Sequence, residues 1–526
     1  MDGVQLLLII GAGIAISAIA RKRNLEPGLI IVVLAAAASF IPGVPRLELE
    51  SEFILAVVVP PLLYSATRGA SFSAFGANLG PVITLGVVLV LLTTGLLGTV
   101  ASWLLPSMGA AAFVLGAVLA PPDTITTVSH GDEIGLPKRV TSILTGESLV
   151  NDATALTLFA IAVGAVNGEH ETWGHGALEL LRNAFVGIGI GALFAVATLY
   201  LRKRLGNATL ETTLVLLLPF TAFLVAEEVE ASGILAVVAA AFIVSTNLTL
   251  DPKHQYPGAY RTRLQEENFW PVVDFLLETF VFAYIGFQLR FVLVDLADSA
   301  EPGLARTLVA AGVLLVVAIL FRLLAVYVLF GRYTIKDRLM RRRIEHDERY
   351  RARLEEIRKR RRHRGGEPLG PPTRKETLLV GWIGMRGILT LAAAGSIPEK
   401  VPGRTAILAI ALFVTLGTLL IQGTTIGWLT RRLRFDLTAE RAADEQMRAR
   451  GRRIAAQAAA GPSADLDAAF EAQRLALGAA VRNRELAEEV ARSMIEDVDL
   501  RQAAVHTAPQ AMLRRRPWPG RPDPPE

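Results

Sequence analysis

Long apolar runs recur along most of this chain, and they restrict its possible folds more than any other feature. Runs of about 20 apolar residues are what a helix needs to cross a lipid bilayer. These runs bring the hydrophobic content to 52% of 526 residues and the mean hydropathy to +0.43, above the usual range for soluble domains. The sequence therefore predicts an all-α membrane protein.

We expect about thirteen transmembrane helices, with boundaries accurate to a few residues. The predicted spans are 3–20, 28–41, 53–67, 80–105, 109–129, 140–166, 177–201, 209–226, 231–246, 270–294, 304–330, 376–397 and 405–430. The first span lacks the basic n-region of a cleaved signal peptide, so we expect it to be retained.

The loops between the spans predict the orientation of the chain. Alternate loops, beginning with 21–27, hold most of the Lys and Arg residues, whereas the opposite loops hold only Arg46, Lys400 and Arg404. Basic residues that flank spans favour the cytoplasmic side. The N-terminus is therefore expected outside and the C-terminus in the cytoplasm, in a multi-pass protein of the plasma membrane.

Three segments fall outside the apolar pattern and give the predicted domain organisation. Within the transmembrane domain 1–433, loop 331–375 is strongly basic, and beside a span its expected partner is anionic lipid headgroups rather than nucleic acid. Residues 434–505 have helical spacing and predict a cytosolic helical tail. Residues 506–526 are rich in Pro and Arg and predict a disordered end.

The sixth predicted span carries polar residues at helical spacing within an apolar run. Its sequence "GESLVNDATAL" belongs to a stripe on one helix face formed by Thr141, Thr145, Ser148 and Asp152, with a neighbouring pair, Glu147 and Asn151. Hydrogen bonds between helices explain the threonines. They explain buried carboxylates poorly, because ionisable groups at membrane depth are costly and usually mark an ion or proton pathway.

The fifth span is expected to break in its middle. Pro121 and Pro122 each remove a backbone donor and clash with the preceding turn, and Asp123 follows them directly. A simple kink is the alternative, but broken helices at membrane depth are tolerated where they line a cavity, and their ends bind ions.

The twelfth span has a matching irregularity, since Gly381, Gly384 and Gly387 surround Arg386 inside an apolar run. An intramembrane Arg needs a carboxylate or carbonyl partner. Spans five and twelve occupy equivalent places if spans 1–6 and 8–13 form two inverted six-helix repeats. Paired discontinuous helices, here crossed, indicate the binding site of a secondary transporter.

Other features carry less weight. Asp274 and Glu278 form an i, i+4 pair in the tenth span, where they either line a funnel or lie at the interface. The motif "GIGIG" at 187–191 indicates close helix packing, because a nucleotide-binding role needs a strand-turn-helix context. The chain has no cysteine and only 7 histidines, which are scattered, so no metal centre or cofactor is expected.

As a set, these motifs resemble the monovalent cation:proton antiporters, and in particular the NhaP-like Na+/H+ exchangers. The resemblance covers about residues 1–433 and rests on "GESLVNDATAL", "PPD", "SGILAVVAA", "FVFAYIGFQL" and "GMRG" in the family's order. It implies exchange of a monovalent cation for H+ by alternating access, electroneutral because the chain has Asn151 before Asp152, in a homodimer. A K+-preferring antiporter is the alternative, and a cation channel or an intramembrane enzyme fits less well.

The resemblance also implies roles for single residues. Asp152 matches the cation- and proton-binding aspartate, and Ser148, Asn151 and Asp123 match further residues of the cation site. Glu147 and Arg386 match a buried ion pair.

Two departures from the family pattern bear on the remaining ligands. The family's Thr-Asp-Pro is replaced by Pro122-Asp123-Thr124, which puts the threonine ligand in question. Ser65 in "PPLLYSA" stands where many members carry an acid.

Overall fold

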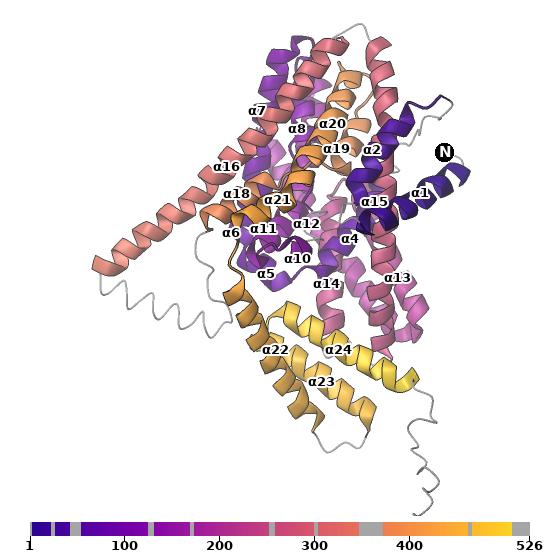
Figure 1. Ribbon diagram of the computed structural model, residues 1–526, viewed down its shortest axis with the longest axis vertical. Coiled ribbons are helices and arrows are strands. Elements are labelled where there is room, and N and C mark those ends of the chain that lie inside the picture. Colours follow the sequence, from indigo (N-terminus) through magenta and orange to yellow (C-terminus); the bar gives the residue numbers. More distant parts are fainter. Residues whose placement is uncertain are drawn as a thin grey trace, which may run out of the picture.

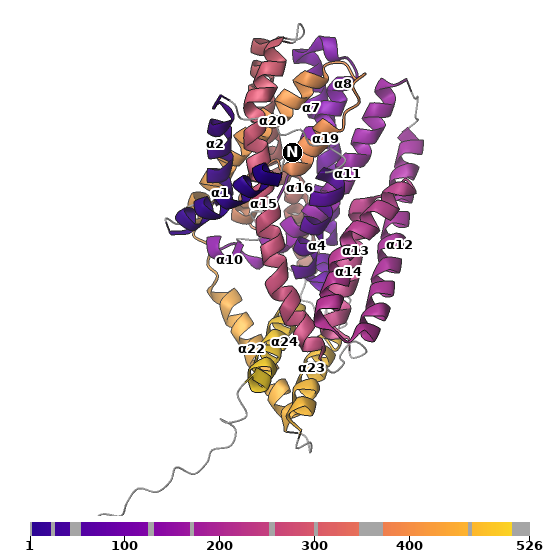
Figure 2. The ribbon, with the colours of Figure 1, turned by 90° about the vertical axis from the view of Figure 1, so that its right-hand side faces the viewer.

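The fold is entirely helical in the part of the chain that the structure describes. This computed structural model describes residues 3–22, 27–42, 54–124, 131–168, 173–251, 258–298, 303–346, 372–460 and 465–507. Within these residues the only β-type contact is an isolated antiparallel bridge between Asp123 and Met385. The helices form an elongated bundle, with three further helices at one end (Figures 1 and 2). The all-α prediction is confirmed.

Helices occupy all thirteen predicted spans. The main ones are α1 (Gly3–Lys22), α2 (Pro27–Ser39), α4 (Val59–Gly69), α7 (Val90–Leu104), α8 (Ala111–Leu119), α11 (Lys138–Val166), α12 (Trp173–Leu205), α13 (Ala208–Glu228), α14 (Gly233–Leu250), α15 (Ala259–Asp298), α16 (Leu304–His346), α18 (Arg374–Trp382), α19 (Ile388–Gly395), α20 (Arg404–Thr418) and α21 (Thr424–Leu433). Shorter helical pieces are η1 (Ile54–Val58), α5 (Phe72–Ala77), α6 (Leu79–Ile83), η2 (Thr84–Leu89), η3 (Pro106–Met108), α10 (Gly131–Ile134) and η5 (Leu419–Gly423).

Length and hydropathy identify a smaller number of helices as clear membrane spans. Among the described residues, 7 helices are long and apolar enough to cross a bilayer, and three shorter apolar helices lie at Leu7–Ala20, Pro27–Ser39 and Gly233–Asn247. The membrane-spanning character is therefore evident, while the number of thirteen crossings and the two inverted repeats stay predictions.

Small residues let helices α12 and α14 approach closely. A Cβ atom on Gly187 would lie 2.4 Å from the Ser232 carbonyl oxygen, and one on Gly191 would lie 2.0 Å from that of Ala236. Any side chain at these two positions would push the helices apart. The packing interpretation of "GIGIG" is confirmed.

The short helix α19 lies where the apolar core of the bundle converges. Its residues Leu389, Ala392 and Ala393 belong to three different clusters of buried hydrophobic side chains. One cluster contains α7, α8 and α20, another contains α2 and α15, and the third contains α12 to α14. The irregular segment before α19 is thus held in the middle of the molecule.

The tail forms three helices that pack beside the bundle end nearest α14 and α15. They are α22 (Thr438–Ala459), α23 (Leu466–Arg482) and α24 (Glu488–Thr507), drawn in gold and yellow in Figure 1. Leu477, Ile495 and Val498 form their core, and Leu250 of α14 joins it. Helicity is observed for the predicted tail, whereas the predicted disorder of 506–526 falls almost wholly outside the described residues.

The basic loop 331–375 begins as a continuation of α16, which runs to His346. Residues 347–371 lie outside the described residues.

Candidate cation-binding site

Two helices break and cross near the centre of the bundle. Helix α8 ends at Leu119, and after Pro121 and Pro122 the chain is no longer helical. Residues 383–387 interrupt the predicted twelfth span between α18 and α19. The two interruptions meet, because the Asp123 backbone N–H donates to the Met385 carbonyl oxygen at 2.6 Å. The predicted discontinuous, crossed helices are confirmed.

A glycine places the Asp123 carboxylate beside the start of α19. Gly387 is the N-cap residue of α19, and a Cβ atom there would lie 2.0 Å from Oδ2 of Asp123. The N-terminal end of a helix carries partial positive charge from its unpaired N–H groups. The carboxylate therefore lies where a half-helix stabilises its charge.

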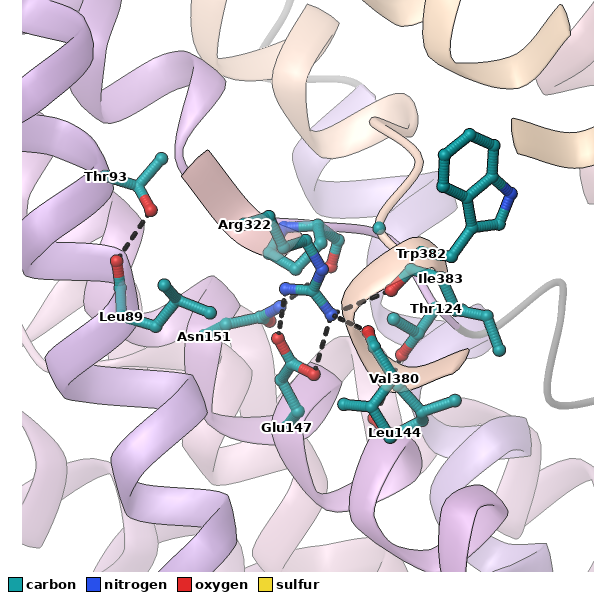
Figure 3. Close-up of polar contacts among 12 residues, drawn as sticks. Leu89, Thr93, Thr124, Leu144, Glu147, Asn151, Arg322, Val380, Trp382 and Ile383 are labelled. Carbon is teal, nitrogen blue, oxygen red and sulfur yellow. Dashed lines mark hydrogen bonds and ion pairs between the residues drawn. The ribbon is translucent and has the colours of Figure 1, made fainter. Parts of the chain in front are cut away.

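Two buried arginines occupy the opposite, C-terminal ends of the broken helices. Arg386 Nε donates to the carbonyl of Leu119, the last residue of α8, at 2.8 Å. Arg322 of α16 donates through Nη2 to the carbonyls of Ile383 at 2.7 Å and Val380 at 3.2 Å, at the end of α18 (Figure 3). The last carbonyl groups of a helix lack hydrogen-bond partners and carry partial negative charge. A guanidinium at this end donates hydrogen bonds to them, and their partial charge stabilises its positive charge.

The buried ion pair of the site differs from the predicted one. Glu147 is 0% exposed and pairs with Arg322, with distances of 2.6 Å from Nη1 to Oε1 and 3.0 Å from Nη2 to Oε2. The expected Glu147–Arg386 pair is wrong, because Arg386 directs its donors to the carbonyls of Leu119 and Gly384 instead.

Arg322 was missed in the sequence although its signal was present. It stands in the apolar run "VVAILFRLLAVYV", so it is an intramembrane arginine of the same kind as Arg386. Two arginines are thus candidate partners for one buried glutamate. Sequence spacing cannot decide between them, because they lie in different predicted spans.

Helix α11 is tied to the broken helix by two side-chain hydrogen bonds. Asn151 Nδ2 donates to the Pro122 carbonyl at 2.8 Å. Thr124 Oγ1 donates to the Leu144 carbonyl at 2.9 Å. Both bonds use groups that the unwound segment exposes, so the segment and α11 hold each other in place. Figure 3 shows Asn151 and Thr124 on either side of the Glu147–Arg322 pair.

The polar stripe of α11 leaves oxygen atoms available for a ligand. Ser148 Oγ and Asn151 Oδ1 are buried and have no hydrogen-bond partner among the described residues. Asp152 lies one turn beyond Ser148 and is 8% exposed. Buried polar atoms are nearly always paired, so such orphans call for an explanation. Alkali cations prefer oxygen ligands, and this donor set fits one.

A small cavity joins the two aspartates. Its volume is about 70 Å³, and its wall includes Asp123, Asp152, Glu278 and Arg386. The predicted site residues Asp123 and Asp152, which come from the fifth and sixth predicted spans, are therefore brought together.

A larger cavity of about 630 Å³ reaches toward the tail. Thr141 and Thr145 of the α11 stripe, Ser65 and Asp274 line it, and Glu278 borders both cavities. Ser65 Oγ donates to Oδ2 of Asp274 at 2.5 Å, so the hydroxyl at the position of the missing acid is bound to an acid of α15. The funnel position of Asp274 and Glu278 agrees with the structure.

Comparison with known proteins places this arrangement in a family. The model of the transmembrane sodium/hydrogen exchanger family matches residues 4–432. The chain belongs to the sodium/hydrogen exchanger family. Members of this family are transporters rather than enzymes, and the matched range includes both crossed helices, the α11 stripe and the small cavity.

Relatives of this chain include proteins named as cation/proton antiporters. The Na+/H+ antiporter NhaG of Bacillus atrophaeus is 28% identical over 468 residues, which cover 85% of this chain and 78% of the relative. A sodium, potassium, lithium and rubidium/H+ antiporter of Bacillus subtilis is 27% identical over 455 residues, covering 82% and 62%. The sodium proton antiporter MjNhaP1 of Methanocaldococcus jannaschii has a similar fold, with a TM-score of 0.59 at 17% identity over 82% of this chain and 97% of that one.

Proposed function

We propose that this exchanger moves a monovalent cation, with Na+ as the expected substrate, against H+ across the membrane. The observation that carries the proposal is the buried Asp152, which shares a cavity with Asp123 at the crossing of two broken helices. The family match supports the same conclusion.

The chemistry needs one carboxylate that is always occupied. Burial disfavours a bare negative charge, so Asp152 is stable with either a proton or a cation bound. Ser148 Oγ and Asn151 Oδ1 are buried neutral oxygens of the same helix that have no hydrogen-bond partner among the described residues, and they would complete the shell of a cation. Because proton and cation compete for the same oxygens, binding one releases the other.

Each turnover is proposed to move no net charge. Asn151, beside Asp152, is neutral, and its amide is engaged with the Pro122 carbonyl. Asp123 keeps its charge at the start of α19, where the helix end compensates it. Only Asp152 then alternates between proton and cation, so one cation exchanges for one proton.

Transport is proposed to follow alternating access, with the crossed helices moving against the rest of the bundle. We propose that the cavity that reaches toward the tail is the route to the site, since Glu278 borders both cavities. We infer from the loop charges that this side faces the cytoplasm and the N-terminus lies outside, in a plasma-membrane protein. We further propose a homodimer and contact of the basic loop 331–375 with anionic lipids.

Potassium is the second candidate cation. The Bacillus subtilis relative is named as an antiporter of sodium, potassium, lithium and rubidium, which supports K+ as an alternative substrate. The replacement of a third-span acid by Ser65 leaves fewer fixed charges in the funnel, and a weaker field favours the larger, more easily dehydrated cation.

Proteoliposomes with an imposed pH gradient test the proposal. Addition of Na+, K+ or Li+ to separate samples should dissipate the gradient only with a transported cation, and we expect the strongest response to Na+. A gradient that none of the three cations dissipates would refute cation/proton exchange. A response to K+ alone would establish the second candidate.

A further inference from the structure

The tail helices form part of the wall of the larger cavity. Asp274, Glu278 and Thr141 line it from the membrane helices, while Asp444, Arg448 and Glu489 line it from α22 and α24. The route toward Asp152 therefore begins between the bundle and the tail. A cation that approaches from this side passes tail side chains first.

Lys138 is contacted by acidic residues from two helices of the tail. It is the first residue of α11 and also lines the cavity. Its ammonium group forms ion pairs with Asp444 and, at 3.8 Å, with Glu489. Its backbone N–H donates to Oε1 of Glu440 at 3.1 Å. Helices α22 and α24 thus both contribute acids to the start of the helix that carries Asp152.

These ion pairs affect the electrostatic potential in the cavity more than they affect the stability of the fold. The paired side chains are 30% to 48% exposed, and exposed pairs contribute little to folding. A cavity mouth, however, focuses the field of its charges and sets the local concentration of ions. An uncompensated Lys138 would repel cations at the point where they enter, against the attraction of Asp274 and Glu278.

We propose that Asp444 and Glu489 are affinity-determining residues for the transported cation, acting by cancelling the charge of Lys138 at the mouth of the pathway. The proposal rests on the proposed function above and adds a role for the tail to it. The docking of the tail has separate supports, namely the two hydrogen bonds from Arg263 to Asp499 and the bond from Arg482 to the Leu250 carbonyl. Neutralising Asp444 and Glu489 therefore leaves the tail in place.

The test compares variants by the dependence of proton flux on Na+ added at the tail-facing side, in everted vesicles. The double variant Asp444→Asn/Glu489→Gln should raise the apparent KM for Na+ roughly two- to five-fold, with Vmax unchanged. Adding Lys138→Gln to this variant should restore the KM. Choline chloride should shrink the difference, since salt screens exposed charges. The matched control is Glu485→Gln, because Glu485 pairs with Arg450 within the tail and does not line the cavity.

Three results would overturn the proposal. They are an unchanged KM in the double variant, an equal rise in the Glu485→Gln control, and a triple variant that keeps the raised KM. A wild-type protein without any Na+-dependent proton flux would instead refute the proposed function, so the two failures are distinguishable.

Discussion

Asp152 and Asp123 line the same cavity, but their surroundings differ, and we propose different roles for them on that ground. Asp123 lies in an unwound segment against the start of α19, where a helix end compensates its charge. Asp152 lies inside the uninterrupted helix α11, away from its ends, and is 8% exposed. A carboxylate in that position is charged only at a cost, which a proton or a cation removes.

Substitution of Asp152 should therefore abolish exchange without unfolding the protein. Asp152→Asn keeps the shape and the hydrogen-bonding capacity of the side chain but cannot release a proton. We expect Na+-dependent proton flux to fall to the level of empty liposomes, with normal expression and thermal stability. Asp436→Asn, an exposed carboxylate after the last span, is the matched control and should transport normally. Near-normal flux in Asp152→Asn would remove this residue from the centre of the mechanism.

Glu147 and Arg322 should act as one structural unit. Both are almost fully buried, and removing one partner of such a pair leaves the other charge uncompensated, at a cost of about 3–5 kcal/mol. Glu147→Gln should lower the thermal stability in detergent more than it changes cation preference. The double variant Glu147→Gln/Arg322→Gln should lose much less than the sum of the single variants. Additive losses would show that the two side chains are energetically independent.

At the scale of helices, the breaks and the polar stripe could be predicted from sequence because each is local. Two adjacent prolines end α8, and spacing alone puts Ser148 and Asp152 on one face of α11. The partner of Glu147 could not be predicted, because Arg322 lies in α16, Arg386 lies in the break between α18 and α19, and both are buried. The predicted start of the tenth span also differs from the start of its helix. Hydropathy puts the start at residue 270, whereas α15 begins at Ala259. Hydropathy identifies only the apolar part of a helix that lies in the membrane. It therefore does not detect a polar extension of the helix toward the tail.

The crossing of the two breaks should be sensitive to a single methyl group. A Cβ atom at Gly387 would lie 2.0 Å from the Asp123 carboxylate, so Gly387→Ala has to displace Asp123 or the start of α19. We expect it to reduce the exchange rate by at least tenfold while the protein still inserts. Gly189→Ala is the control, since a Cβ atom there meets nothing within 4 Å. Equal rates in both variants would show that the close approach is unnecessary for transport.

At the scale of the whole molecule, the tail packs on the transport domain through a network around Asp499. This buried carboxylate accepts hydrogen bonds from Arg263 of α15 and from Arg474 of α23. Burial lowers the pKa of Arg474 from its ordinary value, and Asp499 offsets part of that effect. The Asp499 carboxylate thus pairs with one arginine of the transport domain and one arginine of the tail.

Loss of that carboxylate should loosen the tail. Asp499→Asn leaves Arg263 and Arg474 without their charged partner, and we expect the free energy of opening of α24 to fall by about 3 kcal/mol. Hydrogen exchange of the α24 amides measures this change. Asp467→Asn removes an exposed partner of His506 and should have little effect. Unchanged protection of α24 in Asp499→Asn would mean that the other contacts, such as the apolar packing on Leu250 and the bond from Arg482 to its carbonyl, hold the tail.

The central claim is that one carboxylate exchanges one proton for one cation, and membrane potential tests it most directly. Na+-driven proton movement is measured in vesicles whose potential is clamped by valinomycin and K+, at several potentials. If Asp123 keeps its charge and only Asp152 alternates, neither the rate nor the final pH gradient should change with potential. A rate or an equilibrium that shifts systematically with potential would show that a second charge moves, and the one-carboxylate mechanism would be wrong.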